Sequence, residues 1–341
     1  MGMNLEEFDY HLPKACIAQY PERDREASRL LVLDRADGSM AHRTFRDILQ
    51  YLKEGDVLVL NDSKVVPARI RVHKASGGAV DVLLVEKISE RRWFCLINGV
   101  KSSVSELQVS LGNREATLKR GEEYWIIDFD NNTSIGDIMA EHGKMPLPPY
   151  VKRKGGNGTF DFERYQTVYA EMPGSIAAPT AGFHFTEELL RKIRRMGVHV
   201  LKITLHIGVG TFFLIKTEHV EDHRMHGEFY HMTPETRAFI AKARDDGRRI
   251  VACGTSVVRT LESIANGNGK TPLAGKTDLF IYPGHKFKVV DALITNFHLP
   301  RSTPLLLASA FAGTGNIMRC YTEAMERGYR FYSYGDAMFI L

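Results

Sequence analysis

Hydrophobic residues between positions 66 and 130 recur at every second position in several short runs. The runs are separated by turn residues such as Gly77-Gly78 and Gly112-Asn113, and none has helical spacing. They are Ile70–Val72, Val80–Leu84, Trp93–Ile97, Leu107–Leu111, Ala116–Leu118 and Tyr124–Phe129. Short period-two runs with turns between them predict an antiparallel barrel or sandwich.

The flanking regions instead alternate helical spacing with short apolar runs. Helices are predicted at Leu189–Met196, Glu235–Arg244, Val258–Ala265, Pro304–Phe311 and Met318–Glu326. Buried strands are predicted at Val57–Leu60, Ile203–Ile207, Ile250–Ala252, Leu279–Tyr282 and Leu293–Thr295. Strands that alternate with helices favour an α/β layer. The predicted fold is therefore a mixed-sheet α/β domain, residues 1–65 and 146–341, with an inserted all-β antiparallel barrel domain, residues 66–145.

Composition places the chain among ordinary globular proteins. Of its 341 residues 44% are hydrophobic and 25% charged, and the net charge of +4 permits an anionic partner without requiring one. The four cysteines form no CxxC pair, so neither a disulfide framework nor a cysteine metal site is expected. Met1–Tyr10 lacks a signal-peptide pattern, and the longest apolar run is far below the ~20 residues that span a bilayer. A cytoplasmic protein with no membrane partner is expected.

Polar residues and glycines gather at three junctions, each after an apolar segment. Ala178–Phe185 carries Thr180, Gly182 and His184 before a helix that Thr186 can cap. Gly208–Phe212 ends the second segment and includes Thr211, and Gly254-Thr255-Ser256 ends the third. Ligands of open α/β sheets bind beyond the carboxyl ends of the strands. We therefore expect the three junctions to share one substrate crevice.

Two of the motifs also have plain structural explanations. Gly254-Thr255-Ser256 can hold an anion on its backbone N–H groups, but a tight turn with a helix cap explains the same residues. Thr295–Pro300 can be a satisfied strand end, or Asn296 and His298 can read the edge of a base. The sequence leaves both pairs of alternatives open.

Two other clusters suggest different classes of protein. His206, His223, His226 and Glu228 can be combined into a metal-dependent hydrolase site, although their spacing matches no strong ligand motif, so no metal is expected. Basic clusters suggest an RNA backbone track and a non-catalytic RNA-binding protein; they lie at Lys152–Lys154, Arg191–Arg195 and Arg248-Arg249.

Further motifs run in order through essentially the whole chain. They are Asp9–Pro13 with Ile17–Pro21, Ser28–Leu31, Leu60–Asp62 with Pro67–Arg69, His142–Tyr150, Tyr165–Tyr169, Ala177–Phe185, Leu205–Phe212, Glu221–Glu228, Gly254–Ser263, Thr295–Thr303 and Tyr329–Phe339. Taken together, they resemble the S-adenosylmethionine:tRNA ribosyltransferase-isomerase family of queuosine biosynthesis. The departures are small and leave hydrogen-bonding roles open at positions 213, 227 and 257.

The resemblance implies a transferase and isomerase of the pentosyl-transferring class. Such enzymes transfer the ribosyl moiety of S-adenosylmethionine onto 7-aminomethyl-7-deazaguanine at the wobble position of tRNA. The products are epoxyqueuosine-tRNA, adenine and methionine. S-adenosylmethionine is then a consumed substrate, no cofactor is expected, and the enzyme is expected to be a monomer whose partner is this tRNA.

The resemblance also suggests roles for the motif residues. His184, His226 and Glu228 are the acid–base candidates, since neutral imidazole or a desolvated carboxylate suits proton transfer near neutral pH. The substrate-binding candidates fall into three sets. Gly254, Thr255 and Arg259 are candidates for the methionine carboxylate; Thr180, Thr211, Asn296 and His298 for the nucleoside or base; and Phe212 or Glu228 for the sulfonium. Gly182 is a further substrate-binding candidate.

Overall fold

The structure is a computed structural model that describes residues 2–130, 133–153, 159–212, 214–267 and 271–341, and of Thr211 and Phe212 it describes only the backbone. The chain divides into two compact units. The first contains Met1–Lys64, Pro148–Lys154 and Arg164–Leu341, and the second contains Val65–Leu147 and Gly155–Glu163. The domain boundaries expected at 65 and 146 stay a prediction.

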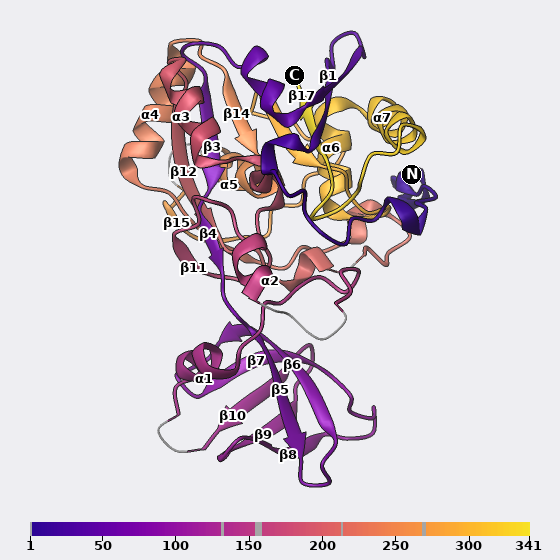
Figure 1. The fold of residues 1–341 in the computed structure, drawn as a ribbon, viewed down its shortest axis with the longest axis vertical. Coiled ribbons are helices and arrows are strands. Elements are labelled where there is room, and N and C mark those ends of the chain that lie inside the picture. Colours follow the sequence, from indigo (N-terminus) through magenta and orange to yellow (C-terminus); the bar gives the residue numbers. More distant parts are fainter. Residues whose placement is uncertain (1, 131–132, 154–158, 213, 268–270) are drawn as a thin grey trace. The chain divides into compact units, whose positions relative to one another are not determined.

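A nine-stranded mixed sheet organises the first unit, in the order β15-β13-β12-β3-β14-β16-β17-β1-β2. Four neighbouring strands, β12, β3, β14 and β16, run parallel, and β17 lies antiparallel to β16. Figure 1 shows β12, β3 and β14 side by side. The strands are β1 (Arg29–Leu33), β2 (Met40–Thr44), β3 (Val57–Asn61), β12 (His199–Leu205), β13 (Glu228–His231), β14 (Ile250–Cys253), β15 (Ala274–Thr277), β16 (Ala292–Asn296) and β17 (Ala337–Ile340).

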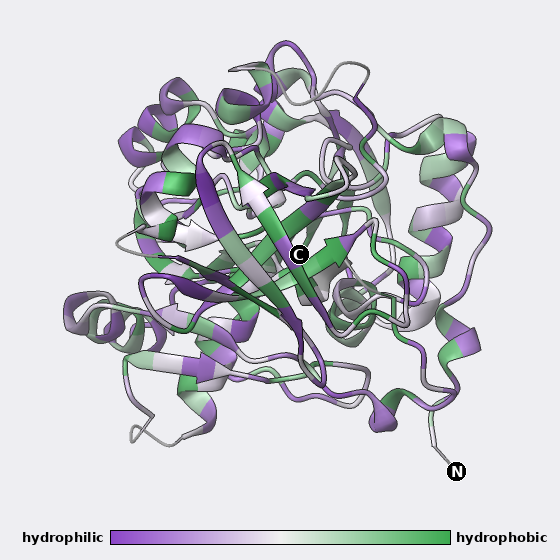
Figure 2. Cartoon of the chain, turned by 90° about the horizontal axis from the view of Figure 1, so that it is seen from below, coloured by the Kyte–Doolittle hydropathy of each residue, from purple (hydrophilic) through white to green (hydrophobic). Residues whose placement is uncertain are grey.

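Helices cover both faces of this sheet because its central strands are apolar on both sides. Val57 and Val59 of β3 belong to one hydrophobic core, whereas Leu58 and Leu60 belong to the other. The first core is closed by α4, α5, α6 and α7, and the second by α3 and the 3-10 helix Phe45–Gln50. Figure 2 shows the strands at the centre in green and purple positions on the surrounding helices. These helices are α3 (Glu187–Arg195), α4 (Pro234–Asp245), α5 (Thr255–Asn266), α6 (Thr303–Ala312) and α7 (Thr314–Glu326).

The second unit contains a closed six-stranded antiparallel barrel in the order β10-β7-β6-β5-β8-β9. Its strands coincide with the six predicted runs, so the predicted α/β fold with an inserted barrel is confirmed. Helix α1 (Ile135–His142) was not predicted. The described residues also form helix α2 (Thr159–Arg164) and a small sheet of β4 (Ser63–Val65) with β11 (Met172–Ser175). The barrel strands are β5 (Arg69–Lys74), β6 (Ala79–Lys87), β7 (Arg92–Asn98), β8 (Glu106–Leu111), β9 (Arg114–Arg120) and β10 (Trp125–Phe129).

All five predicted helices are confirmed, but the predicted strand Leu279–Tyr282 is wrong. The chain leaves the sheet at the end of β15, where the Thr277 hydroxyl accepts the Leu279 N–H at 3.2 Å. Ile281 is nevertheless only 2% exposed, because it packs against the first core. The apolar run therefore signals burial without a ladder of hydrogen bonds. The strand predicted at Ile203–Ile207 begins earlier, at His199.

Candidate active site

A cleft lies in the first unit at the carboxyl ends of the parallel strands. Its cavity volume is about 120 Å³. Residues from widely separated parts of the sequence line it, and several follow β12, β14 and β16, which all end on this edge, or precede β17, which begins there. The lining comprises Tyr150, Tyr165, Ala177–Ala181, Ile207, Gly254–Ser256, Thr295–Leu299, Ser302, Pro304, Tyr332 and Ser333. The structure thus brings together the predicted candidates Thr180, Gly254, Thr255, Asn296 and His298.

Two glycines allow the cleft wall to form. Gly254 adopts a φ of +94°, which a residue with a side chain rarely adopts, at the point where β14 passes into α5. Gly182 lies in the 3-10 helix Thr180–His184, where a Cβ would collide with the Tyr169 hydroxyl. Gly182 itself does not line the cleft, and its contribution is the close packing behind Thr180.

His184 is buried behind the cleft in a chain of directed hydrogen bonds. The Asn296 amide nitrogen donates to the Tyr332 carbonyl at 3.1 Å and faces His184 Nε2 at 3.5 Å. Since an amide N–H can only donate, Nε2 is the acceptor and Nδ1 carries the proton. Nδ1 then donates to the Ser28 hydroxyl at 2.7 Å, and that hydroxyl donates to the Arg25 carbonyl at 3.1 Å. His184 is therefore neutral and fixed in one tautomer.

Burial keeps both cleft histidines neutral. It lowers the pKa of His184 to about 4, an effect that the Arg330 charge reinforces and the Asp336 charge opposes. Burial also lowers the pKa of His298 to about 3. The ring nitrogens of His298 face the Thr295 hydroxyl at 3.0 Å and the Tyr321 hydroxyl at 3.3 Å. At neutral pH these rings serve as hydrogen-bonding groups or proton acceptors rather than as cations.

Glu228 and Arg259 form a buried ion pair in an adjoining cavity of about 40 Å³. This cavity shares Ile207, Thr255 and Ser256 with the cleft. Glu228 also accepts the Gly208 N–H at 2.9 Å, and Arg259 donates to the carbonyl oxygens of Leu279 at 2.9 Å and Thr277 at 3.1 Å. The pair therefore ties together the β12 exit, β13 and the end of β15.

His226, the remaining acid–base candidate, is exposed and does not line the cleft. Its ring comes within 3.1 Å of where a Cβ on Gly210 would stand, beside the segment that carries Thr211 and Phe212. The side chains of those two candidates, and Phe213, lie outside the described residues. Of the other departures, Gly227 is exposed and Val257 is buried in the first core.

The residues of the suggested hydrolase site do not gather around a common point. Within the described ranges, no group of three or more His, Cys, Asp and Glu side chains is arranged to hold a metal ion. His206 stacks on Phe229 and His223 packs edge-on against Phe280, while Glu228 pairs with Arg259. The grouping that a metal-dependent hydrolase requires is not formed by these residues.

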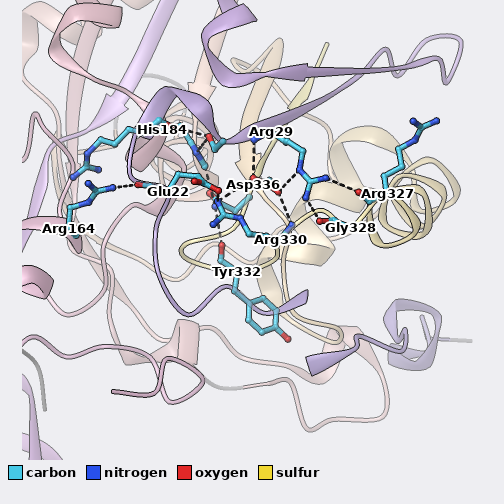
Figure 3. A network of polar contacts seen from close by, with 12 residues as sticks. Glu22, Arg29, Arg164, His184, Arg327, Gly328, Arg330, Tyr332 and Asp336 are labelled. Carbon is cyan, nitrogen blue, oxygen red and sulfur yellow. Dashed lines mark hydrogen bonds and ion pairs between the residues drawn. The ribbon is translucent and has the colours of Figure 1, made fainter. Parts of the chain in front are cut away.

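A network of arginines and carboxylates surrounds the far side of His184 (Figure 3). Asp336, 1% exposed, accepts the backbone N–H groups of Arg29 at 3.0 Å and Arg330 at 2.8 Å. Arg330 also pairs with Glu22 at 3.0 Å. The network holds the turn before β17, from which Tyr332 reaches the cleft.

Several cleft residues were not predicted from the sequence. Tyr332 has a φ of +75°, uncommon for a residue with a side chain, and its ring lies 4.6 Å from that of Tyr150. Ser333 shares a hydrogen bond of 2.6 Å with Tyr150, and Ser28 reaches His184 across 156 positions. Both Tyr150 and Tyr332 lie within motif stretches, and that was the signal available for them.

Comparison with known proteins identifies the family of the chain. The family model described as "Queuosine biosynthesis protein" matches residues 5–340. The chain belongs to this queuosine biosynthesis family. Family membership thus covers both the α/β unit and the barrel, as the motif order suggested.

Individual relatives align with this chain over nearly its full length. The chain is 49% identical to a protein of Thermotoga petrophila and 46% identical to one of Pelobacter propionicus, each alignment covering 99% of this chain and 100% of the relative. Both relatives are named S-adenosylmethionine:tRNA ribosyltransferase-isomerase. A crystal structure of S-adenosylmethionine tRNA ribosyltransferase from Thermotoga maritima is 40% identical, with a TM-score of 0.57, and covers 98% of this chain and 100% of that one. Among the described helices of this family member, none is both long and apolar enough to cross a bilayer.

Proposed function

We propose that the chain is an S-adenosylmethionine:tRNA ribosyltransferase-isomerase. It transfers and isomerises the ribosyl moiety of S-adenosylmethionine onto 7-aminomethyl-7-deazaguanine at the wobble position of tRNA. The products are epoxyqueuosine-tRNA, adenine and methionine. The observation that carries this proposal is the full-length match to proteins of that name, at 49% identity over 99% of the chain.

The chemistry requires one group to remove a proton and others to hold a charged sulfur compound. The sulfonium acidifies the adjacent 5′ carbon of the ribose, so a base that removes this proton prepares the opening of the sugar ring and the loss of adenine. The amine of the deazaguanine then attacks, and methionine leaves as the epoxide closes. S-adenosylmethionine is consumed, so the proposal includes no bound cofactor and no metal.

Neutral imidazoles beside the cleft suit the proton transfers. His298 lines the cleft and His184 is linked to it through Asn296, and burial lowers the pKa of both rings. A neutral ring can accept a proton, although a low pKa makes it a weak base until a developing negative charge stabilises the protonated form. His226 is the exposed candidate beside Gly210, and we retain it as an acid–base residue for the proton that reaches solvent.

The first turn of α5 is our candidate for the methionine carboxylate. Thr255 and Ser256 line the cleft, and the N–H groups of a first helical turn have no acceptor within the helix. Arg259 points instead toward Glu228 and two carbonyl oxygens, so we assign the pair a positioning role. Thr180 and Asn296 then face the nucleoside or the base.

Two isotopic labels test the proposal directly. The protein is incubated with tRNA that bears the aminomethyl base and with S-adenosylmethionine labelled in the ribose or in the methyl group. Ribose label should enter the RNA while one adenine is released for each ribose transferred. Entry of methyl label, or RNA binding without adenine release, would overturn the proposal in favour of a methyltransferase or a non-catalytic RNA-binding protein.

The proposal also includes a monomeric enzyme located in the cytoplasm. The sequence contains no heptad seam that would require a partner chain. Light scattering at working concentration should give the mass of one chain, 38.5 kDa.

A further inference from the structure

None of the described residues that line the active-site cleft has a charged side chain at neutral pH. The lining contains tyrosines, residues with hydroxyl groups, small apolar residues, Asn296 and His298, and burial lowers the pKa of His298 to about 3. Glu228 and Arg259 lie in the adjoining cavity and neutralise each other there. The substrate of the proposed function nevertheless brings a positively charged sulfur into this uncharged cleft.

A sulfonium differs from an ammonium group in the way a protein can bind it. Its sulfur is bonded to three carbon atoms and has no N–H or O–H, so it cannot donate a hydrogen bond to a carbonyl or hydroxyl oxygen. Ligand cations without such donors, for example quaternary ammonium groups, are bound by the faces of aromatic rings, where the ring quadrupole is negative. We therefore looked for accessible rings in the cleft wall.

Two tyrosines of the cleft wall, Tyr150 and Tyr332, form what we call the tyrosine pair. Their ring centres lie 4.6 Å apart and their planes are tilted by 50°, so the rings do not cover each other as parallel stacked rings would. Tyr150 is half-buried and Tyr332 is 7% exposed. The other tyrosine and phenylalanine of the described lining, Tyr165 and Phe297, are fully buried. The tyrosine pair is thus the part of the cleft wall at which a ligand can meet an aromatic ring.

Hydrogen bonds hold Tyr332 in an unfavourable backbone conformation. Its φ is +75°, a region that a residue with a side chain adopts at a cost in free energy. Its N–H donates to the Phe297 carbonyl at 3.0 Å, and its carbonyl accepts from the Asn296 amide at 3.1 Å and from the Gly335 N–H at 2.9 Å. Glycine would adopt the same conformation without that cost. A tyrosine at this position is therefore explained by its ring and not by its backbone.

The tyrosine pair is uncharged at neutral pH. Burial raises the pKa of Tyr150 to about 12, and burial raises the pKa of Tyr332 as well, so neither hydroxyl is ionised. Arg330, two residues before Tyr332, pairs with Glu22 at 3.0 Å and with Asp336 at 3.6 Å, and in Figure 3 the Tyr332 ring points away from these groups. The pair can therefore attract a cation through its ring faces and not as a phenolate.

We propose that the tyrosine pair binds the sulfonium of S-adenosylmethionine, with the sulfur over the face of a ring. This inference rests on the proposed function, because it takes a sulfonium compound as the substrate. It makes Tyr150 and Tyr332 the sulfonium site in place of Phe212 and Glu228, the candidates suggested from the sequence. The pair then distinguishes S-adenosylmethionine from neutral S-adenosylhomocysteine, which lacks the methyl group on sulfur.

The preference for the charged ligand measures this contact. Kd is determined for S-adenosylmethionine and for S-adenosylhomocysteine in the presence of tRNA that carries guanine in place of the aminomethyl base, so that no transfer occurs. In Tyr150→Leu and Tyr332→Leu, the preference for S-adenosylmethionine should fall by about fivefold. A merely structural role of the rings would weaken both ligands alike, and an unchanged preference in both variants would overturn the proposal. Tyr51→Leu is the matched control, since Tyr51 is half-buried and contacts the Phe339 ring outside the cleft lining.

Fluorinated rings test the same contact without changing the shape of the cleft. Tyr150→Phe and Tyr332→Phe keep a ring face and should retain the preference within about twofold. Phenylalanines with an increasing number of fluorine atoms, incorporated at these positions, weaken the ring quadrupole step by step. The affinity for S-adenosylmethionine should fall along the series, while the affinity for S-adenosylhomocysteine and the unfolding temperature stay constant. An affinity for S-adenosylmethionine that is independent of fluorination at both positions would overturn the proposal.

Turnover separates this inference from the proposed function. In Tyr150→Leu and Tyr332→Leu, KM for S-adenosylmethionine should rise while KM for tRNA stays close to that of the wild type. If wild-type protein transfers no ribose label to tRNA, the proposed function fails, whatever the ligand preference is. If it transfers label and both variants keep the wild-type preference for the charged ligand, only the sulfonium site is wrong.

Discussion

The hydrogen-bonded chain around His184 and the Glu228–Arg259 pair both adjoin the cleft, but the first consists of neutral groups and the second of two opposite charges. Around His184 every group is neutral in the bonds that hold it: an imidazole, an amide and the Ser28 hydroxyl. In the pair, a carboxylate and a guanidinium are 5% and 8% exposed in their side chains and neutralise each other.

This difference indicates which residues are available for chemistry. A neutral ring with a depressed pKa can change its protonation state during a reaction, whereas a carboxylate bound to Arg259 and to the Gly208 N–H is already occupied. The contrast favours His184 and His298 near the reacting atoms and makes the pair a brace for the segments around them. The variants below test it in order of decreasing expected effect on stability.

Breaking the ion pair should have the largest effect. Arg259→Met leaves the Glu228 carboxylate buried without its partner, and we expect a loss of about 3–5 kcal/mol in the free energy of unfolding, measured in urea. The double variant Glu228→Leu with Arg259→Met removes both charges and should be clearly more stable than Arg259→Met alone. A double variant as unstable as the single one would contradict the brace.

The exposed pair of Arg71 and Asp81 in the barrel is the matched control for burial. Its side chains are 56% and 44% exposed and their nearest charged atoms are 2.8 Å apart. Arg71→Met should cost less than about 1 kcal/mol, because solvent screens exposed ion pairs. Similar costs at Arg71 and Arg259 would show that burial does not distinguish the two pairs.

Acid should destabilise the protein through His184. Its pKa is about 4 in the folded state, against 6.5 for an ordinary histidine, so above pH 6.5 the ring is neutral in both states and the stabilising contribution is complete. As the pH falls from 6.5 to 4, the unfolded chain takes up the proton first, and about 3 kcal/mol is lost on an order-of-magnitude scale. Urea titrations at several pH values should show a shallower decline in His184→Gln. An identical pH profile in wild type and variant would mean that His184 is not held neutral.

Asn296 orients the neutral chain, and its removal should cost less than breaking the buried ion pair or protonating His184. Asn296→Ala takes away one of the two donors to the Tyr332 carbonyl, which still accepts the Gly335 N–H at 2.9 Å, so the loss of one hydrogen bond should cost about 1 kcal/mol. Turnover should fall as well, since Asn296 lines the cleft. Ser309→Ala is the control: among the described residues the Ser309 hydroxyl is a buried group without a hydrogen-bond partner, and its loss should leave stability and turnover unchanged.

Sequence periodicity predicted the parts of the fold that depend on local alternation. The barrel runs and the five helices follow directly from the spacing of apolar residues. The pattern failed at Leu279–Tyr282, where burial against the core produces the same apolar run as a strand does. Periodicity reports which residues avoid water, and it does not report which backbone groups pair.

Site residues that lie next to predicted elements were predicted from the sequence. Residues that distant segments bring to the site were not predicted. Gly254 and Asn296 follow predicted strands and Thr180 precedes a predicted helix, and the cleft contains all three. Ser28 and Tyr332 are far from these positions in the sequence, and only the folded chain brings them to His184 and Asn296. The sequence also did not predict the ion pair between Glu228 and Arg259, which lie 31 positions apart.

His226 should show the smallest effect on stability and so separates catalysis from structure. Its ring is exposed beside Gly210, and His226→Gln should change the free energy of unfolding by no more than about 0.5 kcal/mol. If it transfers a proton in the reaction, turnover should nevertheless fall by about 10²–10⁴-fold. Unchanged turnover would leave the two buried, neutral histidines, His184 and His298, as the groups that transfer protons. The exposed His226 and the Glu228–Arg259 ion pair would then both lie outside the chemistry.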